Sequence, residues 1–201
     1  MTIKAVYFDF GGVIQRTEFQ APRQHLADGL GIEYEDLVKA VFDSPTAIRA
    51  TVGEIPEEAH WAAVMRRFRL PADRAESFAA EFFAGDVTDL VLLDAIRDLH
   101  KTVKIGLISN AWSGLRPWIV GKKFDDCFDV MIISAEVKQA KPEAPIFHTA
   151  LEALGVSPAE AAFLDDFPAN VAGANAVGMH AIHFAQPEKA LDELQKLLDL
   201  R

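Results

Sequence analysis

Three carboxylates follow two short apolar runs of this sequence. Asp9 lies near the end of the run VYFDF, and Asp165 and Asp166 end the run AAFLDD. Carboxylates that lie close together repel one another and raise each other's pKa unless a cation lies among them. Because oxygen ligands of this kind favour Mg²⁺, the three side chains predict a magnesium site if the two runs lie side by side.

Other side chains capable of chemistry hold comparable positions. Ser109 and Asn110 end the run KIGLISN, and Lys141 stands directly before Pro142, a residue type typical of the first position of a helix. Taken singly, each has an ordinary explanation, since a Ser-Asn pair often caps a helix and a Lys-Pro pair is mostly a surface feature. Their common position at strand ends, in one order, predicts instead that they share a site with the carboxylates.

Five short apolar runs set those positions. Each run is too short for a helix and lacks alternation between apolar and polar residues, as expected for strands covered on both faces. Segments with helical spacing lie between them, such as Leu191, Leu194 and Leu198 near the C-terminus. This order predicts an α/β fold with a parallel sheet, in which ligands bind beyond the carboxyl ends of the strands. The expected strands are Val6–Phe10, Val103–Ser109, Val130–Ser134, Ala162–Leu164 and Ala181–Phe184.

Residues 17–85 interrupt this alternation. They contain several helical patterns and no good strand candidate, and Gly and Pro residues separate the patterns. We therefore predict a helical cap over residues 17–85, inserted into a core of residues 1–16 plus 86–201; the alternative is a helical layer on the same domain. The aromatic residues expected to form the cap's own core are Phe68, Phe78, Phe82 and Phe83.

Composition narrows the class of protein. The chain has 201 residues, with 30 acidic and 20 basic side chains and a formal charge of −10, which disfavours nucleic acid and anionic membranes as partners. A single cysteine, Cys127, cannot form an internal disulfide, as is typical of a reducing compartment. No secretory signal pattern occurs, and no apolar stretch approaches the roughly 18 residues that a membrane span needs. We expect a soluble, cytoplasmic protein.

Four segments resemble, in order and along the whole chain, the four motifs of the haloacid dehalogenase-like hydrolase superfamily: DFGGV, ISNA, KPEAPIF and FLDDFPANVAGANAVGM. The last two look most like the branch that holds sugar-phosphate phosphatases and the N-terminal phosphatase domain of soluble epoxide hydrolase. Any one motif would be a weak signal, whereas the joint pattern is highly specific. The resemblance implies a Rossmann-like core with a helical cap inserted after the first motif.

The resemblance also implies roles for the carboxylates. Asp9 would be the nucleophile that attacks phosphorus and forms an aspartyl-phosphate. Asp9, the backbone carbonyl of Gly11 and Asp166 would hold Mg²⁺, with Asp165 orienting a bound water. The expected cofactor is therefore Mg²⁺, and the expected substrate is a small phosphorylated metabolite.

The remaining site residues would contact the phosphoryl group. Ser109 and the backbone of Asn110 would hydrogen-bond its oxygens, and Lys141 would neutralise both the nucleophile and the transferring group. Lys138, three residues earlier, is expected to be solvated, because the proline that follows Lys141 matches the family's pattern. Asn170 also fits that pattern and is expected to pack or cap a helix.

Gly11 departs from the pattern of the superfamily's usual phosphatases, in which a second Asp protonates the leaving group. Glycine keeps the backbone carbonyl and removes the acid, a loss typically worth roughly 10²–10⁴-fold in rate. Three explanations are open. The leaving group needs little protonation, as in an anomeric sugar phosphate or an acyl phosphate; another group replaces the acid, with Glu18 and Gln15 as candidates; or the site no longer hydrolyses phosphate esters.

The leading prediction is a Mg²⁺-dependent phosphatase. Haloacid dehalogenases also lack the second Asp, because a halide leaves unprotonated, but they need no metal and do not carry the paired acids Asp165 and Asp166. The remaining alternative is a binding or regulatory module on the same fold with degraded catalysis, which only Gly11 supports.

Overall fold

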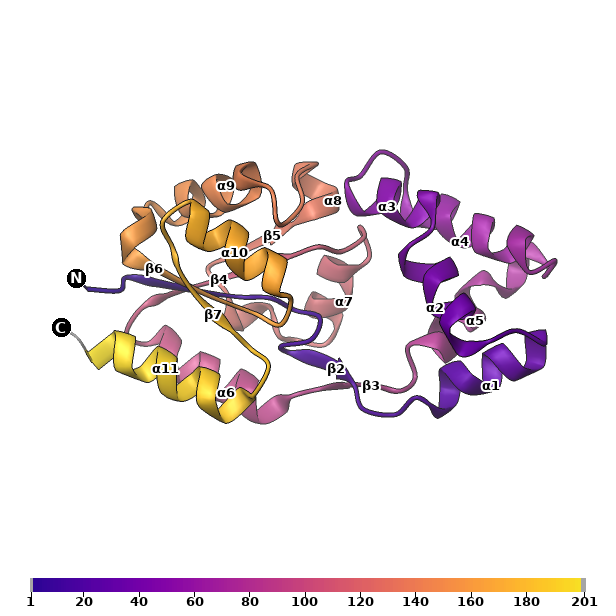
Figure 1. Ribbon diagram of the computed structural model, residues 1–201, viewed down its shortest axis with the longest axis horizontal. Helices are drawn as coiled ribbons and strands as arrows, with labels where there is room; N and C mark the ends of the chain where they lie inside the picture. The colour runs from indigo at the N-terminus through magenta and orange to yellow at the C-terminus, as the bar shows by residue number, and fades with distance from the viewer. Residues whose placement is uncertain (1, 200–201) are drawn as a thin grey trace.

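The computed structural model describes residues 2–199 and contains a five-stranded parallel sheet in the order β5-β4-β1-β6-β7 (Figure 1). The parallel sheet expected from the alternating pattern is confirmed, and each expected strand is present within two residues of its predicted bounds. The strands are β1 (Ala5–Phe8), β4 (Lys104–Ser109), β5 (Val130–Ile133), β6 (Ala161–Asp165) and β7 (His180–His183).

Strand β1 lies at the centre of the sheet with every side chain buried. Its alternate residues serve the two faces: Phe8 packs in one apolar cluster and Tyr7 in the other, where the tyrosine hydroxyl donates to the carbonyl of Ala150 (2.7 Å). Burial on both faces explains why the run is continuously apolar. Packing on both faces therefore fixes the end of the strand, and with it the position of the next residue, Asp9.

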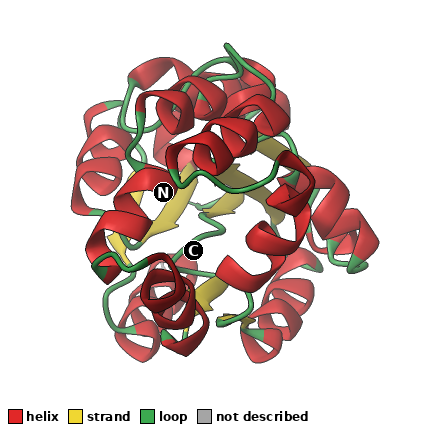
Figure 2. Ribbon diagram, turned by 90° about the vertical axis from the view of Figure 1, so that its right-hand side faces the viewer, coloured by secondary structure: helices red, strands yellow, loops and turns green. Residues whose placement is uncertain are grey.

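Helices cover both faces of the sheet, and a view from the side of residues 21–82 shows the strands at the centre with helices around them (Figure 2). Helices α6, α7 and α11 contribute to one apolar cluster and helices α9 and α10 to the other. The bounds are α6 (Leu90–His100), α7 (Leu115–Gly121), α8 (Ser134–Val137), α9 (Ala144–Leu154), α10 (Pro168–Ala176) and α11 (Pro187–Asp199), with 3-10 turns η2 (Asp125–Cys127) and η3 (Pro158–Glu160).

Residues 21–82 form a separate group of helices beside the sheet, here called the helical insert (Figure 1). Phe78 and Phe82 are fully buried in its apolar cluster, and Phe68 and Phe83 pack against them, as expected from the sequence. The exact boundaries at residues 17 and 85 stay a prediction. The insert comprises α1 (Ala21–Leu30), α2 (Tyr34–Phe42), α3 (Pro45–Thr51), α4 (Glu57–Arg67), α5 (Ala75–Phe82) and the 3-10 turn η1 (Ala72–Arg74).

A short antiparallel ribbon, which the sequence analysis missed, joins the insert to the sheet. Strands β2 (Gln15–Thr17) and β3 (Asp86–Thr88) pair with Arg16 opposite Val87. Each strand has three residues and is mostly polar, so neither produces an apolar run or a measurable alternation. The ribbon brings the two ends of the insert together beside the end of β1.

The insert also contacts the sheet domain through the loop after β4. Trp112 of that loop stacks on Phe42 with ring centroids 6.0 Å apart and lies 4.6 Å from the ring of His60. The backbone N–H of Gly114 donates to Glu57 Oε2 (2.8 Å). Among residues 2–199, no helix combines the length and the apolar character needed to cross a membrane.

Candidate active site

Three central strands deliver the predicted site residues to one edge of the sheet. Asp9 directly follows β1, Ser109 ends β4 and Asp165 ends β6, and β1 is paired with both of its neighbours. Carboxylate oxygens of Asp9, Asp165 and Asp166 lie within 4.8 Å of one another. The convergence expected from the sequence is therefore present in the fold.

Lys141 lies between two of these carboxylates. Its Nζ is 2.8 Å from Asp9 Oδ2 and 2.6 Å from Asp165 Oδ2, and its side chain is fully buried. The prediction that Pro142 begins a helix is wrong: Lys141 and Pro142 form a turn, and α9 begins at Ala144, with a proline at its second position. Lys138 is exposed, as expected.

Asp165 accepts hydrogen bonds through both of its oxygens. Oδ1 accepts from the backbone N–H of Phe167 (2.8 Å) and from Asn170 Nδ2 (3.0 Å), and Oδ2 accepts from Lys141 Nζ (2.6 Å) and from Asn170 Nδ2 (3.1 Å). These contacts occupy the roughly four acceptor positions of a carboxylate. Asp165 thus anchors Lys141 in the structure, and the water-orienting role that the resemblance implied stays a prediction.

Asn170 therefore does more than pack or cap its helix, contrary to the sequence analysis. It is buried on α10 and is the only side-chain amide, among the described residues, that bonds Asp165. Asn170 is the third residue of α10 and lies five positions after Asp165, which ends β6. The short separation along the chain is the signal in the sequence that could have identified this contact.

Asp166 lies against the backbone of Gly12. A Cβ built on Gly12 would lie 2.1 Å from Asp166 Oδ2, and Gly12 has a φ of +80°, a conformation that favours glycine. A Cβ built on Gly11, in contrast, would meet nothing within 4 Å. Gly12 is therefore required by the close approach of Asp166, whereas the absence of a side chain at Gly11 has no steric cause.

The three carboxylates carry more negative charge than the one ammonium can balance. Burial, reinforced by the charge of Asp165, raises the pKa of Asp9 to about 7, although Lys141 and the N–H of Phe10 oppose this shift. Partial burial and the charge of Asp165 also raise the pKa of Asp166. One ammonium cannot balance three ionised carboxylates, so the donor set suits a divalent cation that takes oxygen ligands.

Ser109 and Asn110 lie at the end of β4, beside Lys141. Ser109 is 3% exposed. Asn110 is exposed, and its side-chain amide bonds the backbone of Lys141 in both directions. The contact that the resemblance implied for the Asn110 backbone stays a prediction, and the side-chain contact was not foreseen.

A hollow of about 530 Å³ adjoins the carboxylates on the side of the ribbon. Glu18, one of the two candidates for a replacement acid, lines it together with Asp166, whereas Gln15 does not. Glu18 is half-exposed and forms an ion pair with Arg16 (3.3 Å). The lining residues are Gly12, Arg16, Thr17, Glu18, Asp166, Phe184, Ala185 and Pro187.

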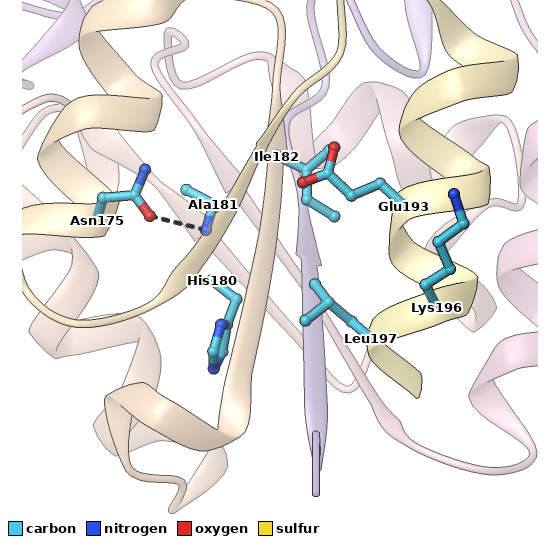
Figure 3. A pocket seen from close by; sticks show the side chains of 7 residues that line it. All are labelled: Asn175, His180, Ala181, Ile182, Glu193, Lys196 and Leu197. Carbon is cyan, nitrogen blue, oxygen red and sulfur yellow. Dashed lines mark hydrogen bonds between the residues drawn. The ribbon is translucent and has the colours of Figure 1, made fainter. Parts of the chain in front are cut away.

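A smaller hollow, of about 280 Å³, lies between the outer strand β7 and helix α11 (Figure 3). Its polar lining includes Glu193 and Lys196 of α11 and Asn175 of α10, whose Oδ1 accepts from the N–H of Ala181 (3.2 Å). None of the three clustered carboxylates lines it. The carboxylate edge, and not this hollow, is the candidate active site.

Relatives with curated names include an epoxide hydrolase and a phosphatase. Bifunctional epoxide hydrolase 2 of Mus musculus is 40% identical over 70 residues, which cover 35% of this chain and 13% of that protein. Phosphoserine phosphatase of Thermus thermophilus is 29% identical over 174 residues, covering 81% of this chain and 68% of that protein. The chain thus spans only a small part of the epoxide hydrolase, and about two thirds of the phosphatase.

A solved structure with the same fold is that of a HAD family enzyme from Bacteroides thetaiotaomicron, in complex with magnesium and inorganic phosphate. It superposes with a TM-score of 0.76 at 21% sequence identity, covering 90% of this chain and 93% of that one. The family described as haloacid dehalogenase-like hydrolase matches residues 3–178, a span that includes every residue of the candidate site. The chain therefore belongs to the haloacid dehalogenase-like hydrolase family.

Proposed function

We propose that this hydrolase is a Mg²⁺-dependent phosphatase that acts on a small phosphorylated metabolite through an aspartyl-phosphate. The observation that carries the proposal is the buried ammonium of Lys141 between Asp9 (2.8 Å) and Asp165 (2.6 Å), with Asp166 beside them. The names of the relatives are consistent with it, since one is a phosphoserine phosphatase and the solved Bacteroides enzyme holds magnesium and phosphate.

The residues present fit Mg²⁺. Asp9, Asp166 and the backbone carbonyl of Gly11 are the oxygen donors that would hold the ion, and Gly12 leaves the space in which Asp166 lies. Magnesium usually takes one or two protein carboxylates together with water and substrate oxygens. When bound, it would supply positive charge to the phosphoryl oxygens.

Asp9 performs the first chemical step. One of its carboxylate oxygens attacks phosphorus, the new P–O bond forms, and the bond to the leaving oxygen breaks with its electron pair. Lys141 offsets the negative charge that Asp9 and the phosphoryl group bring together, and the hydroxyl of Ser109 donates to a phosphoryl oxygen. The product of this step is an aspartyl-phosphate and the departing anion.

Water completes the cycle. Its oxygen attacks phosphorus, the bond between phosphorus and Asp9 breaks, and the carboxylate is regenerated together with inorganic phosphate. Of the two protons of the water, one stays on the phosphate and the other passes to solvent or to the departed anion. The charge that develops on the phosphoryl oxygens is the same in both steps, so Lys141 and Ser109 serve each of them.

The glycine at position 11 limits the range of leaving groups. With no carboxylic acid at this position, the leaving oxygen departs without a proton from the first motif, so weakly basic leaving groups react faster. Sugar-1-phosphates and acyl phosphates meet this requirement better than simple alkyl phosphates. Glu18 lines the adjoining hollow and is paired with Arg16 (3.3 Å), and it stays a candidate for the replacement acid.

A panel of substrates tests the proposal. Acetyl phosphate, glucose-1-phosphate, p-nitrophenyl phosphate and glycerol phosphate are incubated with the full chain, with and without Mg²⁺, beside Asp9→Asn. Turnover is expected only with Mg²⁺ and only with Asp9, and is expected to be fastest for the activated phosphates. Mg²⁺ binding without any hydrolysis would favour a binding module, and halide release from 2-chloropropionate without metal would favour a dehalogenase.

A further inference from the structure

We propose that Asn110 is a positioning residue that holds the turn of Lys141 in place, an inference that rests on the function proposed above. The side-chain amide of Asn110 pairs with the backbone of Lys141 in both directions. Its Nδ2 donates to the carbonyl of Lys141 (2.8 Å), and its Oδ1 accepts from the N–H of Lys141 (2.9 Å).

This pairing joins the side chain of an exposed residue to the backbone of a buried one. Lys141 is 4% exposed, whereas Asn110 is exposed and sits at the end of β4. Lys141 lies in a turn and not in the helix that follows, so no helical hydrogen bond fixes its backbone. Loss of the amide would leave a buried N–H without its partner, and such a group costs more than an exposed one.

Helix α10 packs on the same turn. A Cβ built on Gly173 would lie 2.3 Å from the carbonyl oxygen of Pro142, so the helix backbone packs directly on the turn. The same helix carries Asn170, which bonds Asp165. The turn is therefore in contact with both the Asn110 amide and α10, and these contacts would constrain the distance from Lys141 Nζ to Asp165.

The consequence is a rigid link between two site residues. Asn110 directly follows Ser109, so the amide ties the hydroxyl that faces the phosphoryl group to the lysine that neutralises it. The two backbone hydrogen bonds hold the lysine at its Cα end, and the contacts of Nζ with Asp9 and Asp165 hold it at its other end. Displacement of such a group by about 1 Å can reduce a rate by about 10²-fold.

The kinetic test compares Asn110→Ala with Asn175→Ala in the full chain. Asn175 is the matched control, because its amide also bonds a backbone N–H, that of Ala181, but at the far edge of the sheet. With acetyl phosphate and Mg²⁺, we expect Asn110→Ala to lower kcat about 10- to 100-fold with KM changed less than about threefold. Asn175→Ala should keep the kcat of the unsubstituted protein.

A second readout needs no activity. Lysines are acetylated with a water-soluble acetylating reagent, and mass spectrometry follows Lys141 and, as an internal control, Lys104, whose Nζ donates to the carbonyl of Leu154 (2.7 Å). Asn110→Ala should label Lys141 at least about fivefold faster and leave Lys104 unchanged, because only the turn of Lys141 opens. Thermal unfolding confirms that each variant is folded, and Asn110→Asp, which keeps the acceptor but loses the donor, should give an intermediate labelling rate.

The outcomes distinguish a failure of the positioning role of Asn110 from a failure of the proposed phosphatase function. Unchanged labelling of Lys141 in Asn110→Ala, or an unchanged kcat, overturns the positioning role. Faster labelling in a protein whose unsubstituted form hydrolyses no phosphate supports the positioning role and overturns the phosphatase function. A loss of kcat shared equally by Asn175→Ala would show a general effect of removing an amide and would also overturn the inference.

Discussion

At the scale of single residues, the site depends on one ammonium among three carboxylates. Lys141 is fully buried and bonds two of the acids, while Asp166 faces the exposed side with Gly12 behind it. The amide of Asn110 bonds the backbone of the lysine, and the amide of Asn170 bonds the carboxylate of Asp165. A buried charge of this kind is tolerated only when each partner is held in place, which explains why so many hydrogen bonds converge on one turn.

Position 11 offers a test at this scale. Gly11→Asp places a carboxyl group where a Cβ meets nothing within 4 Å, so the change should be tolerated and should supply a general acid. We expect hydrolysis of glycerol phosphate to rise about tenfold or more, with little gain for acetyl phosphate, whose leaving group needs no proton. Steady-state kinetics on the two substrates check this.

The adjacent glycine provides the control. Gly12→Ala introduces a Cβ about 2 Å from the Asp166 carboxylate at a φ of +80°, so activity on both substrates should fall. Equal gains on the two substrates in Gly11→Asp, or a gain in Gly12→Ala, would contradict the leaving-group argument.

At the scale of elements, the helical insert contacts the sheet domain at several points, and two of these connections follow segments of the candidate site. One is the loop after β4, where Trp112 packs among the aromatic residues of α2 and α4. The other is the β2–β3 ribbon, where Arg23 of α1 bonds Asp86 of β3 (2.7 Å) and lies 4.3 Å from the ring centroid of Phe82. The first connection follows directly after Ser109 and Asn110, so the insert is packed against the segment that would bind phosphate.

The buried ion pair of the ribbon gives a stability prediction. The side chains of Arg23 and Asp86 are 7% and 11% exposed, so Arg23→Met leaves a nearly buried carboxylate without its ionic partner. The free energy of unfolding should fall by about 3–5 kcal/mol, and the double variant Arg23→Met with Asp86→Asn should recover part of the loss. Urea denaturation measures both values.

An exposed pair serves as the comparison. Lys101→Met removes a pair with Asp98 in which the two side chains are 74% and 77% exposed, and should leave the free energy of unfolding nearly unchanged. Similar losses for Arg23→Met and Lys101→Met would show that burial does not determine the contribution of the ribbon's ion pair.

At the scale of the whole molecule, stability should depend jointly on pH and on magnesium. The chain carries a formal charge of −10, and three acids gather at one edge of its sheet. In the metal-free protein the pKa of Asp9 is raised from 3.8 to about 7, so the native state holds a proton that the unfolded chain has already lost. This group therefore destabilises the metal-free fold progressively as the pH rises from about 4 to about 7.

Binding of Mg²⁺ should reverse that loss of stability. A carboxyl group with a pKa of about 7 is about nine-tenths protonated at pH 6, so protons compete with the metal there, and Mg²⁺ should bind about tenfold more tightly at pH 8. The rise in Tm on adding Mg²⁺ should accordingly be larger at pH 8 than at pH 6. Differential scanning calorimetry at the two pH values measures it, and Asp9→Asn should remove most of the difference. An equal rise at both pH values would contradict the assignment of Asp9 as a ligand.

The sequence by itself determined the five strands of the parallel sheet, the helical insert and the residues gathered at the sheet edge. Burial on both faces makes Val6–Phe8 and Ala162–Leu164 continuously apolar, and that pattern is local, so it can be read without the fold. The order of β4, β1 and β6 then brings Ser109, Asp9 and Asp165 together, as the ends of parallel strands must.

Only the tertiary structure decided how those residues are held. The amide of Asn110 meets the backbone of Lys141 across 31 positions, and Trp112 enters an aromatic cluster that belongs to the insert. A turn at Pro142 takes the place of the helix start that the sequence predicted. The ribbon that pairs Arg16 with Val87 was not predicted. Such contacts join side chains that are distant in the chain, so they leave no periodic trace in it, and only the packed arrangement of the layers determines them.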